Sequence, residues 1–62
     1  MEDLLDSLVS EFVNCLSTNG EQYAVNVFSW GVISRNPAIA ADLAINFNEA
    51  ILLYREQQQG NN

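Results

Sequence analysis

The chain has 62 residues, 48% of them hydrophobic, with eight acidic residues, two arginines and no lysine or histidine. This length allows one small domain, and the net charge of −6 opposes binding to nucleic acid or to an anionic membrane surface. One cysteine and no histidine exclude an internal disulfide and a zinc site with the usual ligands.

The first predicted helix spans residues 3–18. Its polar and acidic residues share one side, and acidic residues in its first turn favour the positive end of the helix dipole. Asn19 and Gly20 then supply a stop, because glycine tolerates the backbone conformation that ends many helices. The apolar face consists of Leu4, Leu5, Leu8, Val9, Phe12, Cys15 and Leu16, with Val13 just outside it.

The second predicted helix spans residues 21–34 and is apolar around most of its circumference. One set of residues at helical spacing is Tyr23, Val27 and Trp30, and a second set is Ala24, Phe28 and Gly31. Its β-branched residues make a strand the competing prediction, but these spacings favour a helix. Gly31 weakens a helix, so it indicates close packing of another backbone or, equally, a slight kink or early fraying of the helix.

The third predicted helix spans residues 37–58 and begins at Asn36-Pro37, where Asn is a favoured N-cap and Pro a favoured first residue. The polar segment 59–62 is predicted to be a disordered tail, which leaves residues 1–58 as the single domain.

The third predicted helix has two apolar stripes. The main stripe contains Ile39, Ala40, Leu43, Ala44, Phe47, Ala50, Ile51 and Tyr54, and the opposite one contains Ala38, Ala41, Ile45 and Leu52.

These patterns predict an all-α, three-helix domain that forms a homodimer. One helix cannot direct two stripes inward, and a chain of this size gains from burying surface against a partner. The dimer or partner interface is predicted at Trp30, Ile45, Leu52 and Tyr54, and a different protein is the alternative occupant. The predicted core is Leu5, Leu8, Phe12, Leu16, Val27, Phe28, Leu43, Phe47 and Ile51.

No residue pattern indicates catalysis, and neither a cofactor nor a metal is expected. Without histidine or lysine there is no tunable acid-base partner, and Cys15 on the apolar face is more simply a core thiol. Asp6-Ser7-Leu8 matches the modified tripeptide of carrier proteins, but the helix that precedes it in that family is missing. The third helix is a poor candidate for reading DNA. It opens with Pro-Ala-Ile-Ala-Ala-Asp, which offers no Arg, Lys, Asn or Gln, and its single arginine, Arg55, is near its end.

The function predicted from these observations is a non-enzymatic protein–protein interaction module. The alternative is an acidic inhibitor that imitates nucleic acid, which would depend on Asp3, Asp6 and Glu11; a structural assembly subunit is a third class. The acidic start lacks the positive region of a signal peptide, and no apolar run is long enough to span a membrane. A cytoplasmic location is therefore expected.

In size, acidity and three-helix layout from Asp3 to Gln58, the whole chain resembles the short accessory proteins encoded in the early regions of lambdoid bacteriophages. These proteins often act by binding a host protein or by self-assembly. The resemblance implies a modulator of host physiology or phage development in the bacterial cytoplasm. It includes no motif, so it assigns no functional residue.

Overall fold

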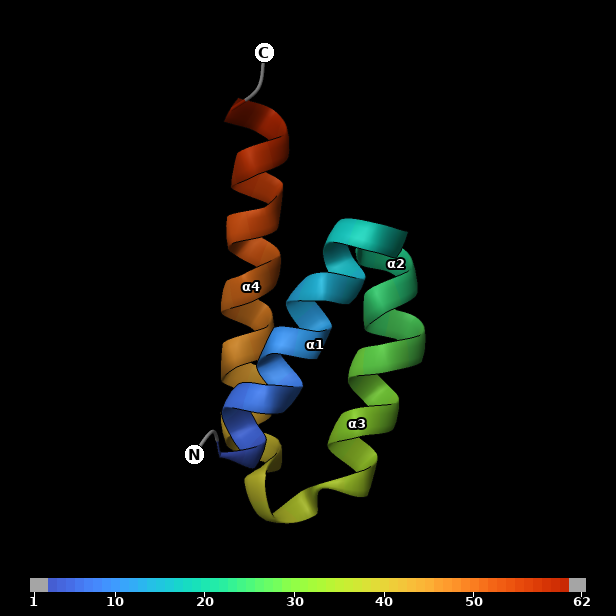
Figure 1. The fold of residues 1–62 in the computed structure, drawn as a ribbon, viewed down its shortest axis with the longest axis vertical. Helices are drawn as coiled ribbons and strands as arrows, with labels where there is room; N and C mark the ends of the chain where they lie inside the picture. Colours follow the sequence, from blue (N-terminus) through green and yellow to red (C-terminus); the bar gives the residue numbers. More distant parts are fainter. Residues whose placement is uncertain (1–2, 61–62) are drawn as a thin grey trace.

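The computed structural model describes residues 3–60, and these residues form helices and turns with no β-strand. The elements, in order, are α1 (Leu4–Asn19), α2 (Glu21–Tyr23), the π-helix η1 (Ala24–Ser29), α3 (Trp30–Arg35), the 3-10 turn η2 (Pro37–Ile39) and α4 (Ala40–Gly60). Because α2, η1 and α3 follow one another without a break, they form one continuous helix, which we call the middle rod. The predicted all-α fold with three helices is confirmed (Figure 1).

The three rods lie side by side (Figure 1). α1 and α4 run in the same direction. The middle rod connects the end of α1 to the turn before α4, and it runs in the opposite direction. The last turns of α4 extend beyond the other two rods, which gives the molecule an elongated shape of 39 × 25 × 18 Å. α4 packs most extensively against α1, so its other sides have fewer neighbours within the chain.

α1 begins and ends one residue later than the predicted range 3–18. At its start, the Oδ1 atom of Asp3 accepts a hydrogen bond from the backbone N–H of Asp6 at 2.9 Å, which is an N-cap. At its end, the Gly20 N–H donates to the Leu16 carbonyl at 3.0 Å, and the Gly20 carbonyl accepts from the Ala24 N–H at 3.1 Å. Gly20 alone therefore joins two helices, with φ 90° and ψ 165°.

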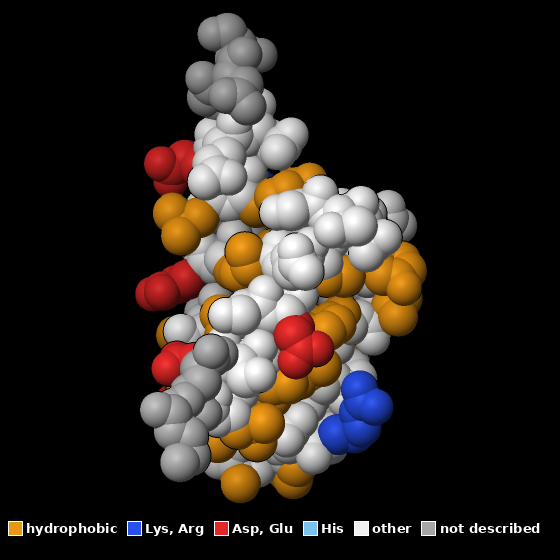
Figure 2. Space-filling model, in the orientation of Figure 1, with side chains coloured by type: hydrophobic (Ala, Val, Ile, Leu, Met, Phe, Trp, Pro, Cys, Tyr) orange, Lys and Arg blue, Asp and Glu red, His pale blue; other side chains and the backbone are white. Residues whose placement is uncertain are grey.

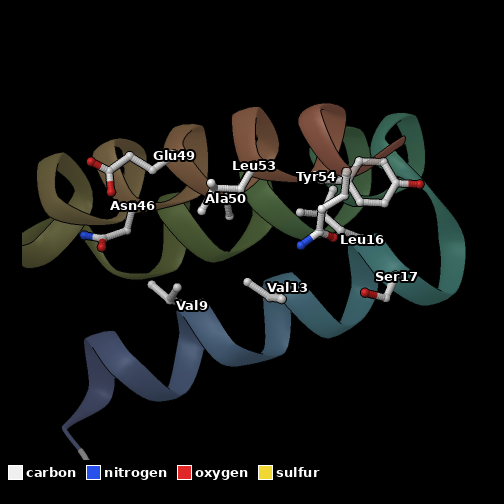
Figure 3. A pocket seen from close by; sticks show the side chains of 10 residues that line it. Val9, Val13, Leu16, Ser17, Asn46, Glu49, Ala50, Leu53 and Tyr54 are labelled. Carbon is white, nitrogen blue, oxygen red and sulfur yellow. The ribbon is translucent and has the colours of Figure 1, made fainter. Parts of the chain in front are cut away.

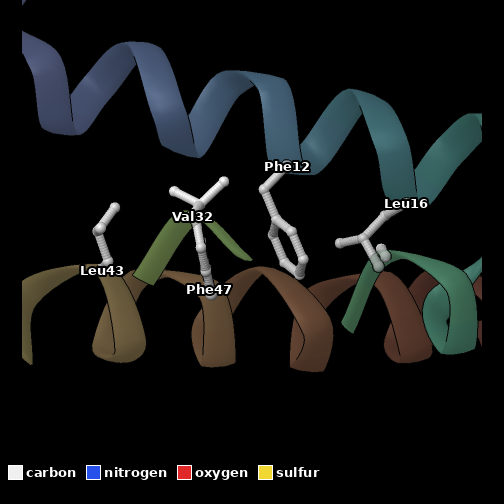
Figure 4. Close-up of a cluster of buried hydrophobic side chains, with 6 residues drawn as sticks. Phe12, Leu16, Val32, Leu43 and Phe47 are labelled. Atoms are coloured by element: carbon white, nitrogen blue, oxygen red, sulfur yellow. The ribbon is translucent and has the colours of Figure 1, made fainter. Parts of the chain in front are cut away.

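The core is built around three phenylalanines, one from each rod. Phe12 and Phe47 stack with ring centroids 4.2 Å apart, and the Phe28 ring lies 5.9 Å from Phe12 and 6.3 Å from Phe47. Phe12 and Leu16 project from α1 toward α4 (Figure 4). Of the predicted core residues, four are buried (Phe12, Leu16, Leu43 and Phe47), and four more pack against them partly buried (Leu5, Leu8, Phe28 and Ile51).

The prediction that Val27 belongs to the core is wrong, because this residue is 58% exposed. It shares a face with Tyr23 and Trp30, and that face points away from α1 and α4. Ser29, in contrast, is buried although it is polar. Ser29 follows the buried Ala24 by five residues, and the i→i+5 bonding of the π-helix brings such a pair to the same side.

Asn36 occupies the predicted N-cap position of the helix that begins at Pro37, but without a side-chain capping bond to that helix. Its Nδ2 atom donates to the Val32 carbonyl at 2.8 Å, so the side chain caps the end of α3 and not the start of the next helix. The carbonyls of a last helical turn have no partner within the helix, and Asn36 satisfies one of them. Pro37 then begins the 3-10 turn η2, and α-helical structure starts only at Ala40.

The C-terminal end of α4 lies further along the chain than predicted. The sequence predicts a helix end near Gln58 and a disordered segment 59–62, but the helix continues through Gln59 to Gly60. Glutamine is a good helix former, so consecutive glutamines extend a helix that has already begun. Asn61 and Asn62 of the predicted tail lie outside the described residues.

Replacing Gly31 by alanine is expected to raise the free energy of unfolding by about 0.5–1 kcal/mol, because alanine loses less backbone entropy in a helix. The structure offers room, since a Cβ atom at Gly31 would meet only the Nη2 atom of Arg35, at 3.7 Å. Urea unfolding at fixed protein concentration measures the difference. A loss of stability would contradict the expectation and would indicate that another backbone packs onto Gly31.

Candidate functional site

The described residues contain no cluster of side chains suited to metal binding. Nowhere in residues 3–60 do three or more Cys, Asp or Glu side chains gather closely enough to hold a metal ion. Cys15 is half-buried, and its Sγ atom accepts a long hydrogen bond of 3.5 Å from the Asn19 side chain. None of the helices in this part of the chain has the length and hydrophobicity that crossing a membrane requires. The surfaces of the rods are therefore the candidate sites.

One surface lies on the outward side of the middle rod, and we call it the Trp30 face. It consists of Tyr23, Val27 and Trp30, whose side chains are 49%, 58% and 62% exposed. The charged residues of this rod are confined to its two ends, Glu21 and Arg35. In Figure 2 hydrophobic side chains gather on the upper part of the outer edge of the middle rod, and a basic side chain lies below them. Large exposed aromatic side chains are typical of protein–protein interfaces.

The Glu21 end of the middle rod is tied to α4 by an ion pair. The Arg55 Nε and Nη2 atoms donate to the two carboxylate oxygens of Glu21 at 2.8 and 2.6 Å. Hydrogen bonding to Arg55 lowers the pKa of Glu21 below its ordinary value, and the same bond raises the pKa of Arg55. The pair is exposed to solvent, so it orients the two rods more than it stabilises the fold.

A second surface lies on the outer side of α4. Ile45 and Leu52 are 60% and 53% exposed and, being seven residues apart, share one face of the helix. Asp42, Glu49 and Glu56 have the same spacing and form an acidic row beside them. Figure 2 shows acidic side chains along the outer edge of α4, with hydrophobic ones between them. This surface is therefore both apolar and negatively charged.

A third surface is the groove between α1 and α4 (Figure 3). Val9 and Val13 point from α1 toward α4, where Ala50 and Leu53 lie opposite them. The groove has a volume of about 290 Å³, and its remaining lining residues are Leu16, Ser17, Asn46, Glu49, Tyr54 and Gln57. A shallower hollow of about 270 Å³ between Glu49, Leu52 and Leu53 adjoins it, so the groove is continuous with the outer side of α4.

The four predicted interface residues do not form one patch. Ile45 and Leu52 lie together on α4, and Trp30 lies on a different rod. Tyr54 is half-buried, packs against the core and lines the groove between α1 and α4. Val13 and Leu53 are also exposed and line this groove, and neither is among the predicted interface residues. The position of Val13 just outside the apolar face of α1 is the sequence signal that could have identified it.

The carboxylates on which nucleic-acid imitation would depend point in different directions. Asp3 uses its carboxylate to cap α1. Asp6 and Glu11 are five residues apart, which places them on different sides of a helix. Glu11 lines a hollow beside Phe28, on the side of α1 away from the groove. These three residues therefore form no row.

Comparison of the chain with protein-family models, with curated proteins and with solved structures finds no match. The resemblance to lambdoid phage accessory proteins thus stays a prediction that rests on size, charge and helix layout. The described residues present three candidate surfaces: the Trp30 face, the outer side of α4 and the groove.

Proposed function

We propose that this protein is a non-enzymatic interaction module that forms a homodimer through the Trp30 face. The observation that carries the proposal is the exposure of Tyr23, Val27 and Trp30 on the rod whose only charged residues, Glu21 and Arg35, are at its two ends. Tryptophan and tyrosine dominate the energetics of many protein interfaces. A second copy would remove all three side chains from water on both subunits at once.

Charge favours the Trp30 face over the other surfaces for contact between two copies. Each chain carries a net charge of −6, so a dimer forms most easily where acidic residues are fewest. A twofold axis perpendicular to the middle rod makes the two rods antiparallel. Arg35 at the end of one rod then lies near the start of the other rod, and its positive charge meets a partner of net charge −6, which favours association.

The outer side of α4 is less suitable for self-association. If α4 packed against α4 of a second copy, the acidic row of Asp42, Glu49 and Glu56 would come close to the same row of the partner. Like charges across an interface are unfavourable. We therefore assign Ile45 and Leu52 to contact with a different protein. If the phage resemblance holds, that protein belongs to the bacterial host.

Imitation of nucleic acid is the alternative function, and the acidic row of α4 is the feature that could support it. Residues seven apart on a helix are separated by about 10.5 Å along its axis, which is wider than the spacing of successive phosphates on a nucleic-acid strand. Asp6 and Glu11, on different sides of α1, add no second row. The apolar surfaces favour protein binding over this alternative.

The proposal is tested by replacing Trp30 with serine. A hot-spot tryptophan contributes about 2 kcal/mol, and each dimer contains two, so the dissociation constant of the dimer should rise by about a thousandfold. Sedimentation equilibrium measures the mass, which should fall from near twice 6.9 kDa toward 6.9 kDa. The far-ultraviolet circular dichroism should remain helical, because Trp30 is exposed and contributes little to the core.

Leu52→Ser is the matched control, because Leu52 is also a large exposed apolar side chain but lies on α4. It should leave the dimer intact. A wild-type protein that is monomeric at all concentrations contradicts the dimer. A Trp30→Ser variant that stays dimeric, or a Leu52→Ser variant that dissociates, contradicts the assignment to the Trp30 face.

A further inference from the structure

We propose that the groove between α1 and α4 binds a basic amphipathic helix of another protein. This inference rests on the proposed function as an interaction module, and it adds the chemical class of the partner. It does not depend on the homodimer, because the groove and the Trp30 face lie on different rods.

The apolar part of such a helix has a place to bind. Val9 and Val13 of α1 face Ala50 and Leu53 of α4, and Leu53 is 60% exposed although it lies beside the groove (Figure 3). A row of leucines or similar side chains, three or four residues apart on the ligand, can lie between the two rods. Peptide helices commonly bind grooves in this manner. The 16 residues of α1 span about 24 Å, which matches a ligand of about four helical turns.

The acidic residues around the groove favour a basic ligand. Glu49 lines the groove and belongs to the acidic row with Asp42 and Glu56. On the other wall, Asp6 lies three residues before Val9 and seven before Val13, so it shares their side of α1. Glu49 therefore lines the groove on the α4 wall, and Asp6 lies on the groove side of α1 beyond its lining residues. Lysine or arginine side chains on either side of an apolar ligand stripe would meet them.

The two cations of this chain lie elsewhere. Arg55 is bonded to Glu21 of the middle rod, and Arg35 is at the end of α3, where its Nε atom donates to the Gly31 carbonyl at 3.2 Å. Neither lines the groove. The groove therefore presents apolar and acidic groups together. This combination disfavours a second copy of this acidic chain, a nucleic acid and an anionic membrane as the occupant.

The experiment uses two synthetic helical peptides of about four turns that carry the same leucine stripe. One has lysine on both sides of the stripe, and the other has glutamate at the same positions. Isothermal titration calorimetry measures their affinity for the full chain, and amide shifts in nuclear magnetic resonance spectra locate the contact. We expect the lysine peptide to bind with shifts at Val9, Val13, Ala50 and Leu53, and the glutamate peptide not to bind.

Variants separate the apolar contribution from the charged one. Leu53→Ser should weaken binding of the lysine peptide by about tenfold or more. The combined change Asp42→Asn, Glu49→Gln and Glu56→Gln should weaken it by about tenfold and reduce its dependence on salt. Leu4→Ser and Glu11→Gln are the matched controls, because both residues are exposed on α1 away from the groove, and they should change little.

Equal binding of the two peptides, shifts confined to the middle rod, or equal effects of the groove variants and their controls would overturn the inference. The outcome stays distinct from that of the dimer test. Binding of the lysine peptide to the Trp30→Ser monomer supports the groove whatever the oligomeric state. A dimer that fails to bind the lysine peptide refutes the groove and leaves the dimer standing.

Discussion

The variant Phe12→Ala is expected to lose about 3–5 kcal/mol of unfolding free energy, which is enough to unfold most molecules of a 62-residue domain. Phe12 is fully buried, its ring stacks on Phe47 at 4.2 Å, and the Phe28 ring lies 5.9 Å away. Removing the ring deletes the side chain that joins all three rods. The alanine side chain cannot fill the resulting cavity, and the rods cannot collapse onto it without displacing the other two rings.

Urea unfolding followed by circular dichroism measures this loss. Protein concentration must be the same for each variant, because dimerisation adds to the apparent stability. Leu4→Ala is the control on the same helix, since Leu4 is a large apolar residue that is 58% exposed, and it should cost no more than about 0.5 kcal/mol. Similar small losses for the two variants would mean that the three rings do not form the stabilising centre of the fold.

The helices could be predicted because their signals are local. The apolar spacing in α1, the stop at Gly20 and the break at Asn36-Pro37 each depend on residues close together in the chain. The role of Asn36 could not be predicted in the same way. Its side chain can cap either the helix before it or the helix after it, and the choice of the Val32 carbonyl depends on the path of the backbone between the two rods.

Most of the core was predicted because Phe12, Leu16, Leu43 and Phe47 lie at the centres of apolar stripes. The middle rod was harder, because it is apolar on two faces and only one can point inward. Choosing between Val27 and Ala24 requires knowledge of how the rod is rotated against α1 and α4. The π-helix adds a change of register within the rod, which the α-helical spacing used for prediction does not include.

The candidate surfaces, like the core, could be predicted from the sequence only in part. Trp30, Ile45 and Leu52 could be identified from the sequence as apolar residues in excess of the core, and all three are exposed. The groove could not, because it exists only where two rods lie side by side. Val13 lies just outside the apolar face of α1 and Leu53 belongs to neither apolar stripe of α4, and they line one groove only through the parallel packing of α1 and α4.

Replacing Gly20 by alanine is expected to lower the free energy of unfolding by about 1–3 kcal/mol. The residue has φ 90° and ψ 165°, a conformation that is almost restricted to glycine, and it alone connects α1 to α2. An added Cβ atom would find no atom within 4 Å, so the cost comes from backbone strain and not from a steric clash with other residues. Urea unfolding of the purified variant measures it.

Stereochemistry provides the control, because a chain of this length can be made by chemical synthesis. D-alanine favours positive φ, so a protein with D-alanine at position 20 should equal or exceed the stability of the glycine protein, since it also restricts the unfolded chain. Opposite effects of L- and D-alanine would establish that the turn between α1 and α2 depends on backbone chirality. Equal losses would refute this, because they would mean that any side chain at the turn disturbs the packing of α1 against the middle rod.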